Sequence, residues 1–205
     1  MINEEKRKQQ QKEYHYKNKE KRNKRCREYI INRKIKVFKI LGEVKCEKCN
    51  EKRLECLTVD HIDNSGFIDK KNGLKDHSLY SAILKGEYPK DKLKNLRVLC
   101  YNCNCSRPRQ YIILSEEKQT YAQKYQLKFW KKAYEFFGPC KTCGETTLQF
   151  LTISHIHNDG ADMKRKGQRG GVNLLYKFGQ LGWPEFLKEN YCLECFNCNC
   201  GRKNI

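Results

Sequence analysis

The chain has 205 residues, with 43 Lys and Arg against 24 Asp and Glu, so its formal net charge at neutral pH is +19. A surplus of this size predicts a polyanionic partner, and nucleic acid in particular. Only 38% of the residues are apolar, and because no apolar run reaches about 18 residues we expect neither a membrane-spanning helix nor a signal peptide. Thirteen cysteines without an export signal favour metal thiolates in a reducing, intracellular compartment over disulfides.

The chain opens with a basic arm. Residues 3–29 are rich in Lys, Arg, Glu and Gln and contain no Pro or Gly, which predicts one long, solvated helix. Apolar residues then recur at near-helical spacing over 30–41 and stop at Gly42, a residue type that commonly ends helices. A similar helix is expected from a Ser115 cap to Phe137. The arm is either a solvated charged face or a surface that lies along phosphates, and the sequence leaves both interpretations open.

Two sets of Cys-x-x-Cys pairs have the spacing of closed tetrahedral zinc sites, in which a loop of tens of residues separates the two pairs. Zinc in such sites is structural, so two structural zinc ions are expected. Cys105, Cys192 and Cys200 are rival ligands, although pairing Cys192 with Cys195 would lose the register between the two sets, and Cys26 is left outside both. The predicted ligand sets are Cys46, Cys49, Cys100 and Cys103, and Cys140, Cys143, Cys195 and Cys198.

The two sets belong to an internal repeat. Cys46 precedes His61 by 15 residues, as Cys140 precedes His155, and each His precedes the third cysteine of its set by 39 and 40 residues, respectively. Agreement over so many landmarks indicates a duplication. The predicted organisation is a basic arm at 1–41, a first module at 42–110, a linker helix at 111–139 and a second module at 140–205.

Each module is expected to combine short strands with exposed loops. Alternating residues predict strands over 53–60 and 147–153, and a third over 96–99 that runs into a cysteine pair. The cationic segments 64–90 and 158–184 are interpreted as exposed loops. The predicted fold class is therefore α+β. The loop residues proposed to contact nucleic acid are Lys164, Arg165, Lys166 and Arg169.

The order of cysteine pairs, Asp60-His61-Ile62, Asn95-Leu96 and Cys103-Asn104 resembles the HNH endonucleases with a ββα-metal fold. It is particularly similar to phage HNH and endonuclease VII-like proteins, whose zinc is held by two Cys-x-x-Cys pairs. The likeness covers the cysteine-bounded part of each half and leaves out the basic arm and the leading helices. It implies two tandem zinc-stapled modules, each preceded by a helix, and divalent-metal hydrolysis of phosphodiester bonds.

The resemblance also implies roles for single residues. His61 would be the general base, Asp60 and Asn104 would bind Mg²⁺ or Mn²⁺, and Asn95 would hold the His-bearing loop through a hydrogen bond. Chemistry supports the first two roles independently. A neutral imidazole accepts a proton near neutral pH, and carboxylate and carboxamide oxygens suit a hard cation.

The second copy departs from this pattern at one position. Ser154 stands where the first copy has Asp60, and a hydroxyl is a much weaker ligand for a hard cation than a carboxylate. We therefore predict that the first site is active and that the second is impaired or architectural. His157 could supply a replacement ligand. The retained counterparts are His155, Asn190 and Asn199.

The expected function is that of a nicking, homing or junction-cleaving endonuclease on double-stranded or branched DNA. The two modules would form an intramolecular pseudo-dimer within a single chain. Two alternatives stay open at this stage. One is a non-catalytic DNA-binding protein with zinc modules, and the other is a protein that binds or cleaves RNA, because a cationic surface attracts either polymer.

Overall fold

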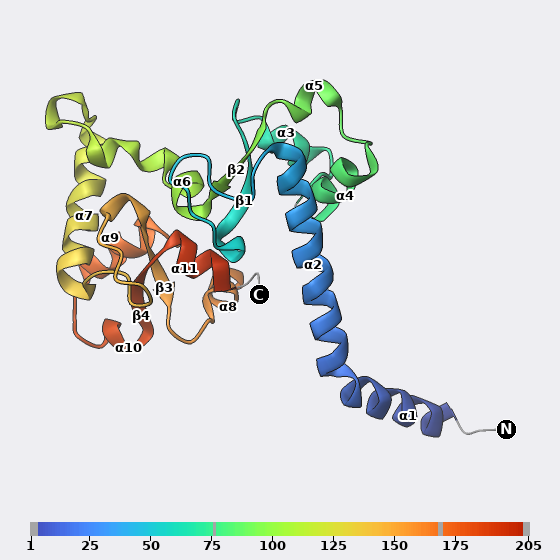
Figure 1. Ribbon diagram of the computed structural model, residues 1–205. Helices are drawn as coiled ribbons and strands as arrows, with labels where there is room; N and C mark the ends of the chain where they lie inside the picture. Colours follow the sequence, from blue (N-terminus) through green and yellow to red (C-terminus); the bar gives the residue numbers. More distant parts are fainter. Residues whose placement is uncertain (1–3, 76, 168–169, 203–205) are drawn as a thin grey trace. The chain divides into compact units, whose positions relative to one another are not determined.

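The computed structural model describes residues 4–75, 77–167 and 170–202. Over these ranges the fold combines helices with two small two-stranded sheets (Figure 1), so the predicted α+β class is confirmed. Residue contacts divide the described chain into two units, one formed by 4–44 and 61–97 and the other by 45–60 and 98–202. Within these ranges no helix is both long and apolar enough to cross a bilayer.

The two units group residues differently from the predicted modules. The first unit joins the basic arm to the segment that follows His61, whereas the second joins the first cysteine set to the whole second copy. The division runs through two strands, between Asp60 and His61 in one and between Arg97 and Val98 in the other. The boundaries at 42, 111 and 140 stay a prediction.

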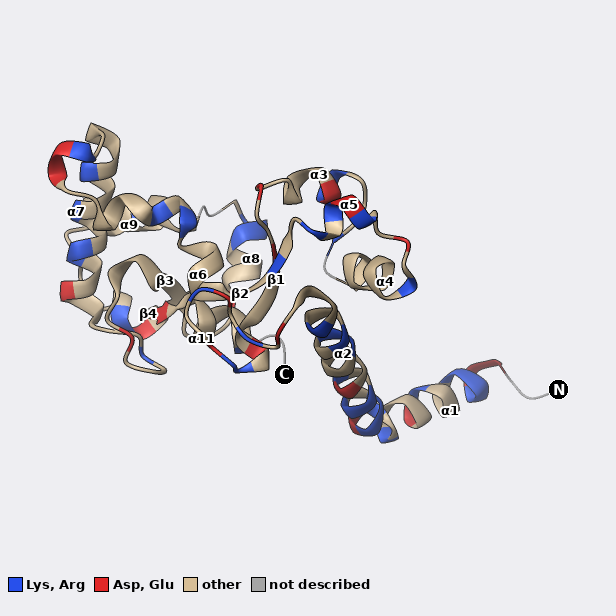
Figure 2. Ribbon diagram, turned by 45° about the horizontal axis from the view of Figure 1, so that its top comes forward, with Lys and Arg blue, Asp and Glu red and all other residues tan. Residues whose placement is uncertain are grey.

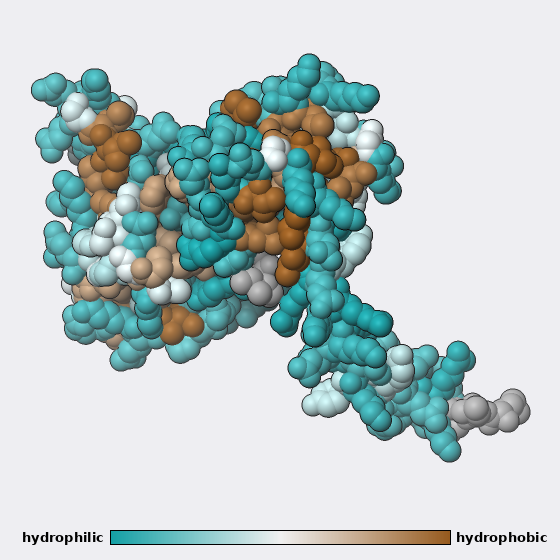
Figure 3. Space-filling model, viewed as in Figure 1, coloured by the Kyte–Doolittle hydropathy of each residue, from teal (hydrophilic) through white to brown (hydrophobic). Residues whose placement is uncertain are grey.

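The basic arm forms two helices, α1 (Glu4–Lys17) and α2 (Lys19–Leu41), where the sequence predicted one uninterrupted helix. They are separated at Asn18, whose φ of −100° and ψ of 4° depart from helical geometry. The backbone N–H and the side-chain Nδ2 of Asn18 both donate to the Tyr14 carbonyl, at 3.0 and 2.9 Å. Lys and Arg are spread along both helices (Figure 2), and the surface of α1 and of the N-terminal part of α2 is mostly hydrophilic (Figure 3).

The first unit is held together at the C-terminal end of α2. Val37 and Phe38 of α2 are fully buried, and Arg33 donates a 2.8 Å hydrogen bond to the His77 carbonyl. Gly42 follows at a φ of 138°, which favours glycine, and ends the helix as predicted. Within α2, the exposed N-terminal part therefore continues directly into a C-terminal part that packs in the first unit.

The segments interpreted as loops are largely helical. α4 buries Leu79, Ala82 and Ile83, whose i, i+3, i+4 spacing places them on one face. In the second copy α9 buries Leu174, Leu175 and Phe178 in the same manner. The loop prediction failed because a high density of charged and glycine residues around each helix masked a short apolar face. The helices are α3 (Gly66–Lys71), α4 (His77–Lys85) and α5 (Lys90–Leu93) in the first copy, and α8 (Gly160–Arg165), α9 (Val172–Gln180) and α10 (Leu187–Asn190) in the second.

Each copy contains one two-stranded sheet followed directly by a short helix. The first strand of each copy begins later than predicted, because the residues just before it, Leu54–Cys56 and Leu148–Phe150, form single 3-10 turns. β3 and β4 pair antiparallel, from Leu151 opposite Cys195 to His155 opposite Tyr191. The elements are β1 (Leu57–His61), β2 (Leu96–Cys100) and α6 (Tyr101–Cys105), then β3 (Leu151–His155), β4 (Tyr191–Cys195) and α11 (Phe196–Gly201).

The linker helix α7 (Tyr121–Phe137) begins six residues after the predicted Ser115 cap. Thr120 caps it, because its hydroxyl accepts a hydrogen bond from the Gln123 backbone while the Gln123 side chain accepts one from the Thr120 backbone. Ser115 instead precedes a 3-10 turn, Glu116–Lys118, and a further 3-10 segment spans Arg107–Ile113. Trp130 of α7 is buried in the core of the second unit.

Removing the cap of α7 should destabilise the second unit. We expect Thr120→Ala to lower its unfolding free energy by ~1 kcal/mol, because the Gln123 backbone N–H loses the hydroxyl that accepts its hydrogen bond. Ser115→Ala is the matched control and should change it by less than ~0.5 kcal/mol. The measurement is chemical denaturation followed by tryptophan fluorescence, since both tryptophans lie in this unit. An equal loss in the two variants would contradict the assignment of the cap.

Candidate functional site

The structure brings each predicted cysteine set together. Within each set the four sulfur atoms lie within 4.8 Å of one another. Cys49 and Cys100 sulfurs are 3.6 Å apart, and those of Cys143 and Cys195 are 3.7 Å apart. A tetrahedral zinc with bonds of about 2.3 Å separates its sulfur ligands by ~3.8 Å, so both clusters are compatible with a structural zinc ion. Cys192, a rival ligand in the sequence, belongs to neither cluster.

The same local backbone builds both clusters. The turn after the first cysteine pair needs a positive φ, which Asn50 adopts at 59° and Gly144 at 75°. At the second pair, the sulfur of the cysteine that caps the helix accepts a 3.4 Å hydrogen bond from a backbone N–H, Cys103 to Cys100 in one copy and the equivalent pair in the other. The Cys103 thiol also donates to Cys100 and lowers the pKa of Cys100 to about 5, whereas burial raises the pKa of Cys49 to about 11, so the negative charge of this cluster is concentrated on Cys100.

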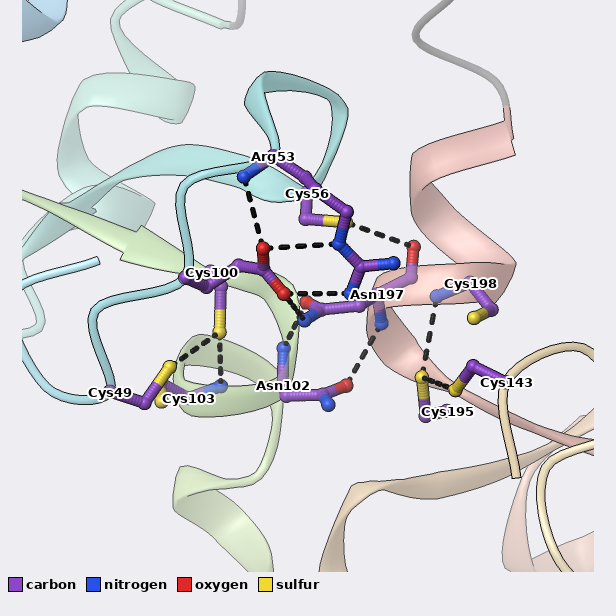
Figure 4. Close-up of polar contacts among 11 residues, drawn as sticks. Cys49, Arg53, Cys56, Cys100, Asn102, Cys103, Cys143, Cys195, Asn197 and Cys198 are labelled. Atoms are coloured by element: carbon purple, nitrogen blue, oxygen red, sulfur yellow. Dashed lines mark hydrogen bonds and ion pairs between the residues drawn. The ribbon is translucent and has the colours of Figure 1, made fainter. Parts of the chain in front are cut away.

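Equivalent residues of the two copies meet within the second unit. The backbone N–H of Asn102 donates to the Asn197 side-chain oxygen, and that of Asn197 donates to the Asn102 side-chain oxygen, both at 2.9 Å (Figure 4). Both asparagines are buried. The thiols of Cys105 and Cys200 are also hydrogen bonded, which raises the pKa of Cys105. A reciprocal contact of this kind is the signature of a two-fold arrangement, here between α6 and α11.

Asp60 and Asn104 converge on one cationic group. Arg107 Nη2 forms an ion pair with Asp60 Oδ1 and donates a 3.4 Å hydrogen bond to Asn104 Oδ1. Asp60 is 5% exposed, so its charge is held largely out of water and depends on a positive partner. The sequence interpretation did not identify Arg107, although an arginine stands three residues after the Cys-Asn pair in both copies.

The second copy repeats this arrangement with a different carboxylate. Arg202 Nη2 donates to Ser154 Oγ at 3.0 Å and to Asn199 Oδ1 at 3.4 Å, and it also forms an ion pair with Glu194. Glu194 is 2% exposed and accepts a 2.7 Å hydrogen bond from Thr142. The second centre therefore keeps a buried acid, arginine and asparagine.

The carboxylate has moved from one strand of the sheet to the other. Glu194 lies on β4 opposite Thr152 of β3, and side chains two residues apart on a strand share a face, so Glu194 and Ser154 are diagonal neighbours. The equivalent of Glu194 in the first copy is Leu99, which is fully buried. The sequence did contain a sign of this buried carboxylate, because Glu194 is the single acidic residue of the strand Tyr191–Cys195. His157, the expected replacement ligand, is exposed.

His61 lies at the end of β1 and contacts a buried acid from α3. Its Nε2 is 2.9 Å from Asp69 Oδ2, and the Tyr88 hydroxyl donates a 2.6 Å hydrogen bond to the same oxygen. Asp69 and Tyr88 are 4% and 5% exposed. Burial by itself raises the pKa of Asp69, but the hydrogen bonds from Tyr88 and His61 outweigh it and lower that pKa. Neither Asp69 nor Tyr88 was predicted, because both lie in the segment interpreted as a loop.

Asn95 and its counterpart hold the turn that follows each histidine. The Ile62 backbone N–H donates to the Asn95 carbonyl at 2.8 Å, and Ile156 donates to the Asn190 carbonyl at 2.9 Å. The Asn95 side chain also donates to Asp63 Oδ2 at 3.4 Å. The backbone oxygen, and not the side chain alone, therefore connects this position to the His-bearing loop.

His155 differs from His61 in its surroundings. Its Nε2 is buried and has no hydrogen-bond partner among the described residues. The positions of Asp69 and Tyr88 are taken by Met163 and Trp183 in the register of the repeat, and Met163 lines a cavity of about 250 Å³ together with His155. The second copy thus keeps the histidine and has Met163 where the first copy has Asp69.

Of the residues proposed to contact nucleic acid, Lys164 and Arg165 lie on α8 and Lys166 follows it, and all three are exposed. Arg165 forms an ion pair with Asp162. Arg169 lies outside the described residues.

Comparison with protein-family models, with curated proteins and with solved structures found no match to this chain.

The two cysteine clusters should bind zinc independently. We expect about two zinc ions per unmodified chain and about one in either Cys103→Ser or Cys198→Ser, because each substitution removes one of four thiolates. Cys192→Ser is the control and should retain both ions. Zinc is measured by elemental analysis of the purified chain. Loss of an ion in the Cys192 variant would contradict the ligand sets.

Proposed function

We propose that the chain is an HNH-type, metal-dependent DNA endonuclease that nicks duplex DNA or cuts branched DNA, with its competent centre in the first module. One observation carries the proposal. The oxygens of Asp60 and Asn104 converge on a single cationic group, and His61, a residue that can accept a proton, follows Asp60 directly in the chain. Hydrolysis of a phosphodiester needs such a cation position and such a base.

The donor set suits Mg²⁺ or Mn²⁺. Asp60 and Asn104 offer hard oxygens around the position of one Arg107 nitrogen, and Mg²⁺ is commonly held by few protein oxygens together with water and phosphate. Arg107 and the ion would compete for those oxygens. When bound, the ion would supply Lewis-acid stabilisation of charge on the phosphoryl and leaving oxygens.

The protein's own groups would then divide the remaining work. His61 takes the proton from the attacking water as the new P–O bond forms and the bond to the leaving oxygen breaks. Arg107, displaced from Asp60, is a guanidinium suited to a phosphate oxygen. Asn95 keeps the His-bearing loop in place through its carbonyl.

Nucleic acid as the partner is supported by charge. The chain carries a net charge of +19, and exposed Lys and Arg residues occur along α1 and α2 and on α8 (Figure 2). Cationic side chains of this kind bind phosphates without reading sequence. The reciprocal contact of Asn102 and Asn197 supports a pseudo-dimer in which the second copy grips DNA.

The cleavage test compares the two histidines. With Mg²⁺ or Mn²⁺ present, supercoiled plasmid and a four-way junction are incubated with the unmodified chain, His61→Ala or His155→Ala. We expect His61→Ala to lose at least ~100-fold in rate, because it removes the general base, and His155→Ala to retain the activity. Nicked circles are the expected plasmid product.

The other outcomes separate the alternatives. Loss of cleavage in either variant, with linear product, would mean that both centres cut and that Glu194 serves the second. Salt-sensitive binding without cleavage by the unmodified chain would favour a zinc-stapled DNA-binding protein. Cleavage or tight binding of structured RNA in preference to both DNA substrates would favour an RNA-directed function.

Competition between Arg107 and the metal gives a separate prediction. Arg107→Ala should tighten Mn²⁺ binding by about tenfold, or ~1.4 kcal/mol, because it leaves a buried carboxylate without its cation. Arg53→Ala is the matched control, since Arg53 pairs with Glu51 away from Asp60. Calorimetric titration of the DNA-free, zinc-loaded chain measures the affinity. Weaker Mn²⁺ binding in Arg107→Ala would show that the arginine does not compete with the ion.

A further inference from the structure

We propose that Asp69 and Tyr88 are positioning residues for His61, which fix its ring so that Nε2 carries the hydrogen and Nδ1 carries the lone pair that accepts the proton. The inference rests on the proposed function and adds two residues to it. It is carried by the contacts of His61 within the first unit and by the loss of both partners in the second copy.

The direction of the hydrogen bonds assigns the tautomer. Asp69 Oδ2 receives the Tyr88 hydroxyl at 2.6 Å and faces His61 Nε2 at 2.9 Å. An ionised carboxylate only accepts hydrogen bonds, so Nε2 must be the donor. In a neutral imidazole the other nitrogen, Nδ1, is then the acceptor.

The carboxylate is itself held firmly. Asp69 is almost completely buried, and two hydrogen bonds to one of its oxygens stabilise its charged form. Burial and the hydrogen bond to Asp69 raise the pKa of Tyr88, so its hydroxyl remains a donor near neutral pH. The three side chains therefore form a chain of hydrogen bonds from Tyr88 through Asp69 to His61, in which each donor and acceptor is defined.

The opposite edge of the ring is restrained by backbone. A Cβ added to Gly66 would lie 2.9 Å from His61 Nδ1, which is closer than a carbon and a nitrogen normally approach. Gly66 thus leaves room beside Nδ1 that any other residue would fill. The ring is held between the start of α3 on one side and the Asp69 carboxylate, from the same helix, on the other.

The second copy lacks this arrangement. Gly160 approaches His155 Nδ1 in the same way, with an added Cβ at 2.7 Å, so the ring and the helix start are retained. Met163 replaces the acid and Trp183 replaces the tyrosine, and His155 Nε2 is left buried without a partner among the described residues. An unpaired buried polar atom is destabilising. The second copy thus has the histidine without the two residues that position it in the first copy.

The first experiment reads the tautomer without requiring catalysis. Nitrogen-15 histidine spectra of the full chain should show His61 as the fixed Nε2–H tautomer. Asp69→Ala should convert it to a mixture, and Tyr88→Phe should leave it largely Nε2–H. Asp162→Ala, which removes an exposed acid from the equivalent helix of the second copy, is the matched control and should change nothing. An Nδ1–H tautomer of His61 in the unmodified chain would overturn the inference.

The second experiment asks whether the contact acts through His61. Asp69→Ala should lower kcat for plasmid nicking by about 100-fold with little change in KM, and Asp69→Glu should restore part of it. In a His61→Ala background the same substitution should have no further effect, because positioning residues and their target act as a unit. A further loss in that background would mean that Asp69 only supports the fold, and the inference would fail.

The two failures are distinguishable. Cleavage by the unmodified chain that persists at full rate in Asp69→Ala would overturn the positioning role and leave the proposed function standing. Absence of cleavage by the unmodified chain on every substrate would overturn the proposed function and, with it, the catalytic meaning of the contact. Folding of each variant is checked by zinc content, which should be unchanged because Asp69 lies outside both clusters.

Discussion

Each cluster of four cysteines joins a tight turn to the junction of a strand and a short helix. The sulfurs of Cys49 and Cys100 are 3.6 Å apart and those of Cys143 and Cys195 are 3.7 Å apart, although these residues are separated by 51 and 52 positions in the chain. α6 and α11 are too short to be stable in isolation, so they depend on tertiary links for their position. Zinc would supply the strongest of these links, because metal-binding free energy is also folding free energy in small modules.

Because the clusters fix the start of α6 and α11, they also fix the positions of the polar side chains on and just after these helices. Asn104 and Asn199 follow the last cysteine of each set directly, and an arginine follows one turn later. In both copies that arginine reaches back to an acid and to the asparagine. A buried acid needs a cation, and the geometry supplies one with the protein's own side chain. A divalent ion at this position would take over a charge-balancing role that the fold already requires.

The two copies differ in where their polar side chains lie. The buried acid is on β1 in the first copy and on β4 in the second, and each is paired with the arginine that follows the last cysteine of its set. The surroundings of the histidine were not compensated in this way, since Met163 stands where Asp69 contacts His61. The two copies therefore retain the scaffold in common and differ in the polar contacts of the histidine. The proposed division into one catalytic and one architectural module rests on that difference.

The amino-acid sequence alone determined the features that depend on local spacing. The cysteine sets, the repeat and the helix end at Gly42 follow from fixed separations or from helical periodicity. The start of α7 depends on which polar side chain caps the helix, Ser115 or Thr120, and the sequence favoured the wrong one. The choice is a competition between local hydrogen bonds of similar strength. The break at Asn18 was not predicted either.

Only the tertiary structure decided the pairings between distant residues. Glu194 beside Arg202 depends on the register of β3 and β4 and on where α11 ends, and Asp69 beside His61 and Tyr88 depends on the packing of α3. No periodicity marks such partners, because a single acid or tyrosine in a polar segment looks like a solvated side chain. Spacing along the chain is fixed by covalent geometry, whereas contact between distant side chains is fixed by how the helices and strands pack.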